Sequence, residues 1–132
     1  MNLSEQVVSL EIAKKLRELG VKQESLFYHH KQGTLGGQIS WVLSKYDEVN
    51  IKDDADWLKN KGVAAFTVAE LGELLPENSQ ELEIRQIKLD SGYWLEYWKF
   101  NEQIYMVGGE DTEANARANM LIYLLENEII KP

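Results

Sequence analysis

The sequence of 132 residues contains no cysteine. This absence excludes disulfides, thiolate catalysis and cysteine-based zinc sites, and it is compatible with a reducing compartment. The chain also lacks any apolar run near the roughly 18 residues that a membrane-spanning helix needs. Because the N-terminal residues show no basic segment followed by an apolar one, we expect no signal peptide, no membrane association and a cytoplasmic protein.

Positive charge is scarce in the second half of the chain. Residues 67–132 contain five Lys and Arg against thirteen Asp and Glu, whereas residues 1–66 contain nine of each. The second half therefore accounts for the whole net charge of −8. Since an acidic field repels phosphate groups, nucleic acids and anionic membranes are disfavoured as partners, and solubility is the simplest role of this charge.

The remaining composition is that of an ordinary soluble protein, with 44% hydrophobic and 27% charged residues. The length suits one domain spanning residues 1–132. Neither an internal repeat nor a low-complexity linker divides the chain.

Two helices are predicted before residue 80. The first begins at Ser4 or Ser9, which are both suitable N-caps, and ends at Leu19. The second opens with the capping box Thr67–Glu70. In this motif the Thr67 hydroxyl accepts from the backbone amide of Glu70, and the Glu70 carboxylate accepts from the backbone amide of Thr67. Pro76 ends this helix because proline lacks the N–H that the helix interior needs.

The last helix is predicted from Asp111 to Ile129. Three alanines make its first half slim, and large aliphatic side chains make its second half thick. A helix of this kind lies flat on a surface, close at one end and deeply buried at the other. The expected surface is the aromatic strand pair at residues 93–107.

Five segments alternate apolar with polar residues or are rich in aromatic and β-branched residues. We expect these segments to be strands: 25–31, 38–46, 82–89, 93–100 and 103–107. The apolar residues of 82–89 change phase, which predicts a β-bulge near Arg85 or Gln86. Segment 93–100 is bulky on both faces, as is typical of a central strand in a sheet covered on both sides. Asp47–Asp56 is expected as a loop, followed by a helical turn at 55–61.

These elements predict an α+β fold. It consists of one antiparallel or mixed sheet of about five strands with three to four helices packed on it.

Two segments resemble motifs of a family of small bacterial and phage or prophage proteins. They are Ala65–Pro76 (AFTVAELGELLP) and Thr112–Asn127 (TEANARANMLIYLLEN). The opening segment Ser9–Phe27 is similar to the start of the same family, and the matches cover about half the chain in the same order. The resemblance implies a phage or mobile-element origin and a compact sheet-and-helix fold, but it carries no activity and no functional residues to this chain.

Candidate catalytic and metal motifs are weak. His29 and His30 are neighbours on a predicted strand, so they point to opposite faces and do not chelate one ion together. Asp53–Asp56 lacks the Gly and Glu that a calcium loop requires, and Gly33–Gly37 lacks the Lys-Ser/Thr pair of a phosphate loop. We therefore expect no catalytic, cofactor-binding or metal-binding residue.

Two alternatives remain open. One is a small-molecule-binding domain or small enzyme whose pocket is assembled from separated residues such as His29, His30, Asp47 and Glu96. The other is a nucleic-acid-binding module, since Ala13–Tyr28 invites comparison with a helix-turn-helix. Its lysines lie on the first helix, however, and the residues from Ser25 onward are β-like.

Aromatic side chains supply the preferred functional hypothesis. Sheet packing is their ordinary role, but Tyr and Trp are also common anchors of protein interfaces. The candidate interaction patch consists of Trp41, Trp94, Tyr97, Trp98 and Tyr105. We expect a small accessory protein that binds an unidentified protein partner without catalysis, and self-association through a sheet edge or a slim helix face stays open.

Overall fold

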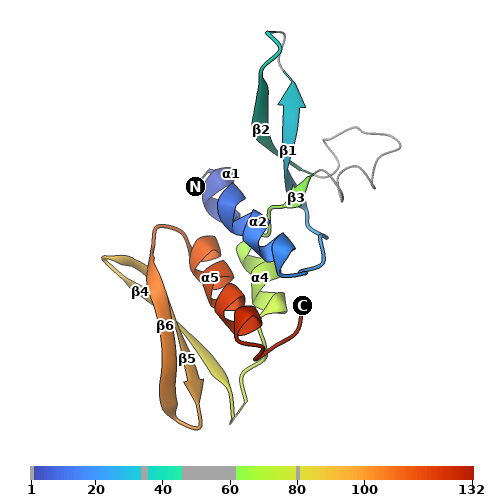
Figure 1. Cartoon of the computed structure of the whole chain (residues 1–132). Helices are drawn as coiled ribbons and strands as arrows, with labels where there is room; N and C mark the ends of the chain where they lie inside the picture. Colours follow the sequence, from blue (N-terminus) through green and yellow to red (C-terminus); the bar gives the residue numbers. More distant parts are fainter. Residues whose placement is uncertain (1, 34–35, 46–61, 80) are drawn as a thin grey trace.

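The computed structural model of the chain describes residues 2–33, 36–45, 62–79 and 81–132. Within these ranges it has four helices: α1 (Leu3–Gln6), α2 (Leu10–Glu18), α4 (Val68–Leu74) and α5 (Glu113–Glu126). The strands are β1 (Phe27–Gly33), β2 (Ile39–Lys45), β3 (Val63–Ala64), β4 (Glu83–Leu89), β5 (Gly92–Lys99) and β6 (Glu102–Glu110) (Figure 1). The loop expected at 47–56 and the helical turn expected at 55–61 lie outside the described residues.

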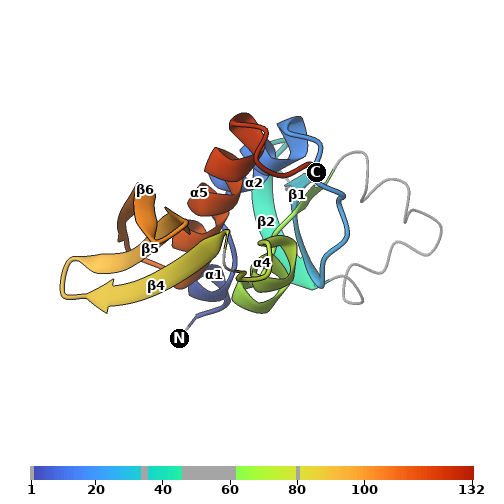
Figure 2. The same ribbon diagram turned by 90° about the horizontal axis from the view of Figure 1, so that it is seen from below.

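The fold is α+β, but its strands form two sheets rather than the one sheet of about five strands that the sequence predicted. Both sheets are antiparallel and three-stranded, with strand orders β2-β1-β3 and β4-β5-β6. The division follows from α5, which is apolar on two sides and lies between the second sheet and helices α2 and α4 (Figures 1 and 2). A helix with two apolar sides needs cover on both.

The buried side chains of α5 divide between two clusters. Residues that pack with α2, α4 and the first sheet are Ala114, Ala118, Leu121 and Leu125. Residues that pack on the second sheet are Ala116, Met120 and Leu124. The expectation that this helix lies on strands 93–107 is therefore confirmed, and the alanines in its first half allow close approach on both sides.

Local signals for the helix ends are confirmed. Ser9 occupies the N-cap position of α2, and Leu19 is its C-cap. At α4 the Thr67 hydroxyl accepts from the Glu70 amide at 3.2 Å, and the Glu70 carboxylate accepts from the Thr67 amide at 2.9 Å. The same carboxylate accepts from the Ser25 hydroxyl at 2.8 Å, so this cap also fixes the approach to β1.

The first sheet is mainly the hairpin of β1 and β2. Strand β3 pairs with β1 only at Tyr28 and His29, so the rest of the hairpin extends away from the helices (Figure 1). The root of the hairpin is held where the Ala65 amide donates to the Phe27 carbonyl at 2.9 Å and where the His29 ring bonds to the Val8 carbonyl at 2.9 Å.

The second sheet corrects one prediction and confirms another. Pairing of β4 with β5 runs without a shift from Glu83–Trp98 to Leu89–Gly92, so the predicted bulge near Arg85 or Gln86 is wrong. The change of phase arises because the strand places apolar residues on both of its faces. The register shifts lie instead in the pairing of β5 with β6. Strand β5 is the central strand, as expected from its composition, but among the described residues a helix covers only one face of this sheet, whereas cover on both faces was predicted.

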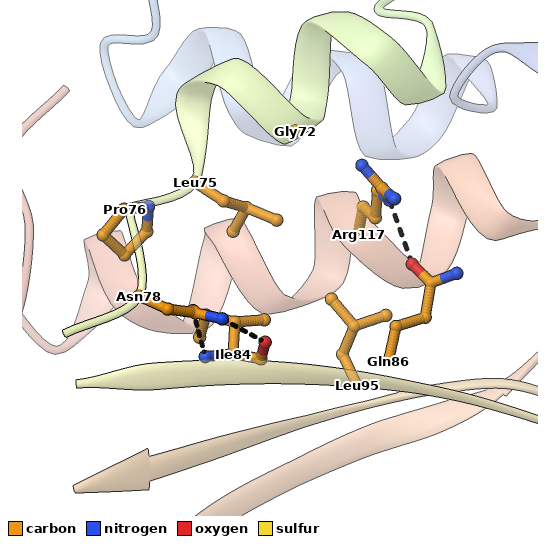
Figure 3. A pocket seen from close by; sticks show the side chains of 8 residues that line it. All are labelled: Gly72, Leu75, Pro76, Asn78, Ile84, Gln86, Leu95 and Arg117. Carbon is orange, nitrogen blue, oxygen red and sulfur yellow. Dashed lines mark hydrogen bonds between the residues drawn. The ribbon is translucent and has the colours of Figure 1, made fainter. Parts of the chain in front are cut away.

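A cavity of about 260 Å³ lies where α4, α5 and the second sheet meet (Figure 3). Its charged lining residue, Arg117, donates to the Val68 carbonyl at 3.2 Å, to the Gln86 side chain at 3.0 Å and to the Glu113 carboxylate at 3.1 Å. These contacts use three of the five guanidinium N–H groups, and through them Arg117 joins the two helices to β4.

None of the helices in the described ranges is long and apolar enough to cross a bilayer.

Candidate protein-interaction surface

The second sheet has one face on α5 and one face that no other described element covers. Side chains alternate along a strand, so the buried Leu95 and Tyr97 of β5 point to α5 and their neighbours point away. We call this second side the outer face. Strand pairing assigns to it Glu83, Arg85, Ile87, Leu89, Trp94, Glu96, Trp98, Met106 and Gly108. Ile104 belongs to it by alternation with Tyr105, which points to α5.

Four large aliphatic side chains of the outer face are exposed. The exposed fractions are 37% for Ile87, 52% for Leu89, 45% for Ile104 and 46% for Met106. Ile87 and Leu89 lie on β4, Ile104 and Met106 lie on β6, and the central strand β5 with Trp94 and Trp98 lies between the two pairs. Single exposed apolar residues are ordinary on protein surfaces, but several of them on one sheet face are typical of an interaction site.

Trp94 forms a flat centre for this surface. A Cβ built on Gly108 of the neighbouring strand would lie only 2.2 Å from Cδ2 of Trp94, so the indole lies directly on the glycine backbone. The indole N–H donates to the Ser91 hydroxyl at 3.1 Å, which fixes the orientation of the ring. The outer face therefore presents an ordered aromatic platform.

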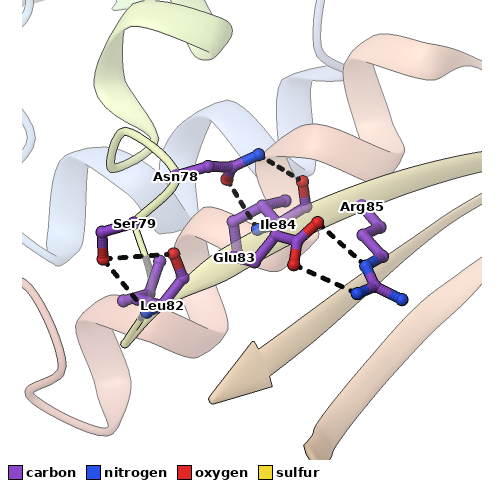
Figure 4. Close-up of polar contacts among 6 residues, drawn as sticks. All are labelled: Asn78, Ser79, Leu82, Glu83, Ile84 and Arg85. Atoms are coloured by element: carbon purple, nitrogen blue, oxygen red, sulfur yellow. Dashed lines mark hydrogen bonds and ion pairs between the residues drawn. The ribbon is translucent and has the colours of Figure 1, made fainter. Parts of the chain in front are cut away.

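Trp98 lies beneath the charged part of the outer face. The Arg85 guanidinium is 4.1 Å from the Trp98 ring centroid. Two of its three nitrogens, Nε and Nη2, donate to the two carboxylate oxygens of Glu83 at 3.0 and 3.1 Å (Figure 4). These hydrogen bonds lower the pKa of Glu83 below its ordinary value, and the adjacent charge of Arg85 acts in the same direction. The buried indole N–H of Trp98 has no hydrogen-bond partner among the described residues.

The edge of β4 is partly covered near this charged pair. The Asn78 side chain accepts from the Ile84 amide at 2.8 Å and donates to the Ile84 carbonyl at 3.4 Å (Figure 4). The side-chain amide thus occupies the groups that an added strand would use.

The five aromatic residues of the candidate patch lie in three places. Trp94 and Trp98 share the outer face. Tyr97 and Tyr105 point to the other face and contact Tyr123 of α5, with ring centroids 6.4 and 3.6 Å away respectively. Tyr105 and Tyr123 are stacked, with 3° between their planes.

Trp41, the fifth member, is in β2 of the other sheet. It lies between the lysines of two different elements, with Nζ of Lys14 at 4.8 Å and Nζ of Lys31 at 5.5 Å from the ring centroid. The structure therefore brings two of the five residues together on an uncovered surface, and their role in binding stays a prediction.

Sequence reasoning did not select the aliphatic members of the outer face. The change of phase at Ile87 and Leu89 was explained by a β-bulge. Ile104 and Met106 belong to the predicted strand 103–107, which was given no role in binding. The available signal was the second apolar parity itself: a strand with apolar residues on both parities has a second face to cover.

The residues of the alternative pocket are separated. The His29 ring bonds through Nε2 to the Val8 carbonyl at 2.9 Å, and the His30 ring bonds through Nε2 to the Ser44 hydroxyl at 3.0 Å. Glu96 lies on the outer face of the other sheet, and Asp47 lies outside the described residues. In the part of the chain that the structure describes, no three His, Asp or Glu side chains converge as a metal site.

Comparison of the chain with protein-family models, curated protein sequences and solved structures gives no match. The surface of the molecule is therefore the basis on which its function is inferred.

Proposed function

We propose that this protein acts by binding another protein through the outer face and catalyses no reaction of its own. The exposed group of Ile87, Leu89, Ile104 and Met106 beside Trp94 is the observation that supports the proposal. Fully burying one such side chain contributes about 1.5–3 kcal/mol, so covering four that are already half-buried gives roughly 4 kcal/mol. A rigid sheet supplies this contact with little loss of conformational freedom on binding.

We also propose that the protein is cytoplasmic and that it is an accessory protein of phage or prophage origin. The absence of cysteine and the two motif segments support this part of it.

Partner capture with matched variants tests the proposal. The baits are the wild-type protein, the double variant Ile87→Ser with Met106→Ser, and the control Ile39→Ser. Ile39 is 71% exposed on β2, so its replacement removes an exposed aliphatic side chain far from the outer face. We expect the wild type and the control to retain the same partner and the double variant to lose it.

Mass spectrometry identifies the retained protein, and binding is then repeated with purified components. Circular dichroism confirms that each bait is folded. Equal retention by all three baits would remove the outer face from the proposal. Turnover in a substrate screen, together with no retained partner, would favour a small enzyme instead.

A further inference from the structure

The two edges of the second sheet differ in how they are protected. At the β4 edge, the Asn78 side chain occupies the backbone N–H and C=O of Ile84, and the strand also carries Arg85 and Lys88. At the β6 edge, no backbone group receives a hydrogen bond from outside the sheet among the described residues, and the strand contains neither a cation nor a proline. Lysine, proline and covering side chains are the usual means of blocking an edge, so β6 is the edge that is open to pairing.

The free backbone groups of β6 belong to Met106 and Gly108. Backbone groups along a strand point alternately to one neighbouring strand and to the other. At the covered edge Ile84 points out of the sheet, so its partner Tyr97 points from β5 to β6. Tyr97 pairs with Tyr105, which therefore points into the sheet. The pairing is regular from this residue to Gly108, so Met106 and Gly108 direct their N–H and C=O groups out of the sheet.

A cavity of about 260 Å³ lies beside this edge, between β6 and α5. Its apolar lining consists of Tyr105, Val107, Ile122 and Tyr123. Glu126 also lines the cavity, and its nearest cation is Nζ of Lys15 at 4.0 Å, a pair that is half exposed and therefore weak. A long side chain with an apolar stem and a cationic end, such as lysine or arginine, fits this combination.

The charges around the cavity also favour a basic ligand. Glu102 and Glu110 lie at the two ends of β6 and have the parity of the inner face, on the same side as Glu126. Together β6 and α5 contain one cation, Arg117, and its guanidinium is bonded toward α4 and β4. An interface is favoured when opposite charges meet across it, so a ligand at this edge should carry positive charge.

We propose that an extended basic segment of a partner protein adds to the free edge of β6 as a fourth, antiparallel strand of the second sheet. The proposal rests on the proposed function and deepens it, because alternate side chains of the added strand lie beside Ile104 and Met106 on the outer face. These side chains are aliphatic, and those between them are lysine or arginine that enter the cavity beside α5. The regular stretch of β6 sets the length of the added strand at about five residues.

A second copy of this chain is a poorer occupant of the edge. Antiparallel pairing of β6 with itself, centred on Met106, would place Glu102 of each copy opposite Glu110 of the other. Like charges directly opposite one another destabilise a pair of strands. In any register, β6 has no lysine or arginine to place in the cavity.

Binding of short labelled peptides, followed by fluorescence anisotropy, tests the proposal. The probe is a peptide of about six residues that alternates valine and lysine, and its comparison alternates valine and glutamate. We expect the lysine peptide to bind at least about tenfold more tightly, because its side chains enter an acidic cavity.

Backbone methylation distinguishes an added strand from simple attraction of a polycation to an acidic protein. In an antiparallel pair, the residue opposite Met106 exchanges hydrogen bonds with it and shares its face, so this residue is a valine of the probe. Methylating the valine amides should abolish binding, whereas methylating the lysine amides, which point away from β6, should leave binding within about threefold. The two methylated peptides have the same charge and composition, so equal binding by both would overturn strand addition.

Matched variants locate the site on the protein. Met106→Pro removes the free N–H of the edge, whereas Met106→Ala removes the same side chain and keeps the N–H. Proline is tolerated where a strand N–H faces solvent, and circular dichroism checks the fold of each variant. Met106→Pro should weaken binding of the lysine peptide about tenfold relative to Met106→Ala. Glu126→Gln should weaken it about threefold, and the exposed Glu73→Gln on α4 should not change it.

Partner capture with Met106→Pro separates this inference from the proposed function. Loss of the partner from Met106→Pro but not from Met106→Ala supports the added strand. A partner that Met106→Pro retains, but that the double variant Ile87→Ser with Met106→Ser loses, keeps the proposed function and rejects the added strand. A partner that every bait retains rejects both.

Discussion

Replacing Gly108 by alanine should displace the Trp94 indole from the outer face. A Cβ at Gly108 would lie 2.2 Å from Cδ2, 2.3 Å from Cε3 and 2.6 Å from Cγ of Trp94. Carbon atoms in contact are normally about 3.5–4.0 Å apart, so the ring would have to move by more than about 1 Å. Gly108 does not have a positive φ, so alanine itself fits the backbone there.

The expected destabilisation is about 2 kcal/mol. Forcing a methyl group into a packed site costs about 1–3 kcal/mol. Moving the ring also breaks the hydrogen bond from Trp94 to Ser91, which contributes about 0.5–1.5 kcal/mol. Alanine also lowers the conformational entropy of the unfolded chain, which stabilises the folded protein by about 0.4–1 kcal/mol and offsets part of these losses.

Urea unfolding followed by far-UV circular dichroism measures this change. Gly108→Ala should be compared in the wild type and in a Trp94→Ala background. We expect the destabilisation to vanish in that background, because no ring is left to displace. Gly33→Ala is the control: nothing lies within 4 Å of a Cβ at Gly33, so its free energy of unfolding should change little.

The result that refutes this reasoning is an equal loss of stability in both backgrounds. The glycine would then be needed for its backbone and not for the indole. An unchanged free energy of unfolding for Gly108→Ala in the wild type would equally contradict the contact between ring and backbone.

Three further predictions concern stability. Arg117→Ala should lower the free energy of unfolding by about 2–3 kcal/mol in chemical denaturation, because its hydrogen bonds join α4 and α5 to β4. Glu70→Ala should cost about 2 kcal/mol by the same assay, whereas the exposed Glu73→Ala on the same helix should stay within about 0.5 kcal/mol. Burial lowers the pKa of His29 below 6.5, although its hydrogen bond to the Val8 carbonyl acts in the opposite direction. The unfolded chain then binds the proton more readily, so stability is complete above about pH 6.5 and falls as the pH decreases, and this dependence should be smaller in His29→Gln.

Local structure was predictable because its causes are local. The capping box at Thr67 and Glu70 needs only residues three positions apart, and it forms as expected. Ser9 occupies the N-cap position of α2 as expected, although its side chain makes no capping hydrogen bond. The sheet arrangement was not predictable in this way, since the choice between one sheet and two depends on which side of α5 each hairpin covers. The sequence showed that α5 is rich in alanine and leucine, but not that it lies between two layers.

Only part of the candidate surface was predictable, because the sequence shows which residues of a strand share a face but not which face is covered. Trp94 and Trp98 have the same parity on one strand, which the sequence shows directly. Tyr97 is on that strand with the opposite parity, and only the position of α5 tells which parity is covered. Trp41 belongs to a different sheet, and no pattern within a strand could separate it from the others.

Salt should distinguish self-association, which the sequence leaves open, from binding of a basic partner, because the long-range force between the two molecules is repulsive in the first case and attractive in the second. Two copies of net charge −8 with centres about 30 Å apart repel by roughly 9 kcal/mol in water without salt. Screening reduces this repulsion to the order of 1 kcal/mol at 0.1 M salt. Ion pairs across a wet interface would weaken at the same time, but they contribute only about 0–1 kcal/mol each. Repulsion is therefore the larger effect, and dimerisation should strengthen with salt. A basic partner is attracted by the same acidic charge, so its binding should weaken with salt, and a wild-type dimer that dissociates as salt is added would contradict the argument from net charge.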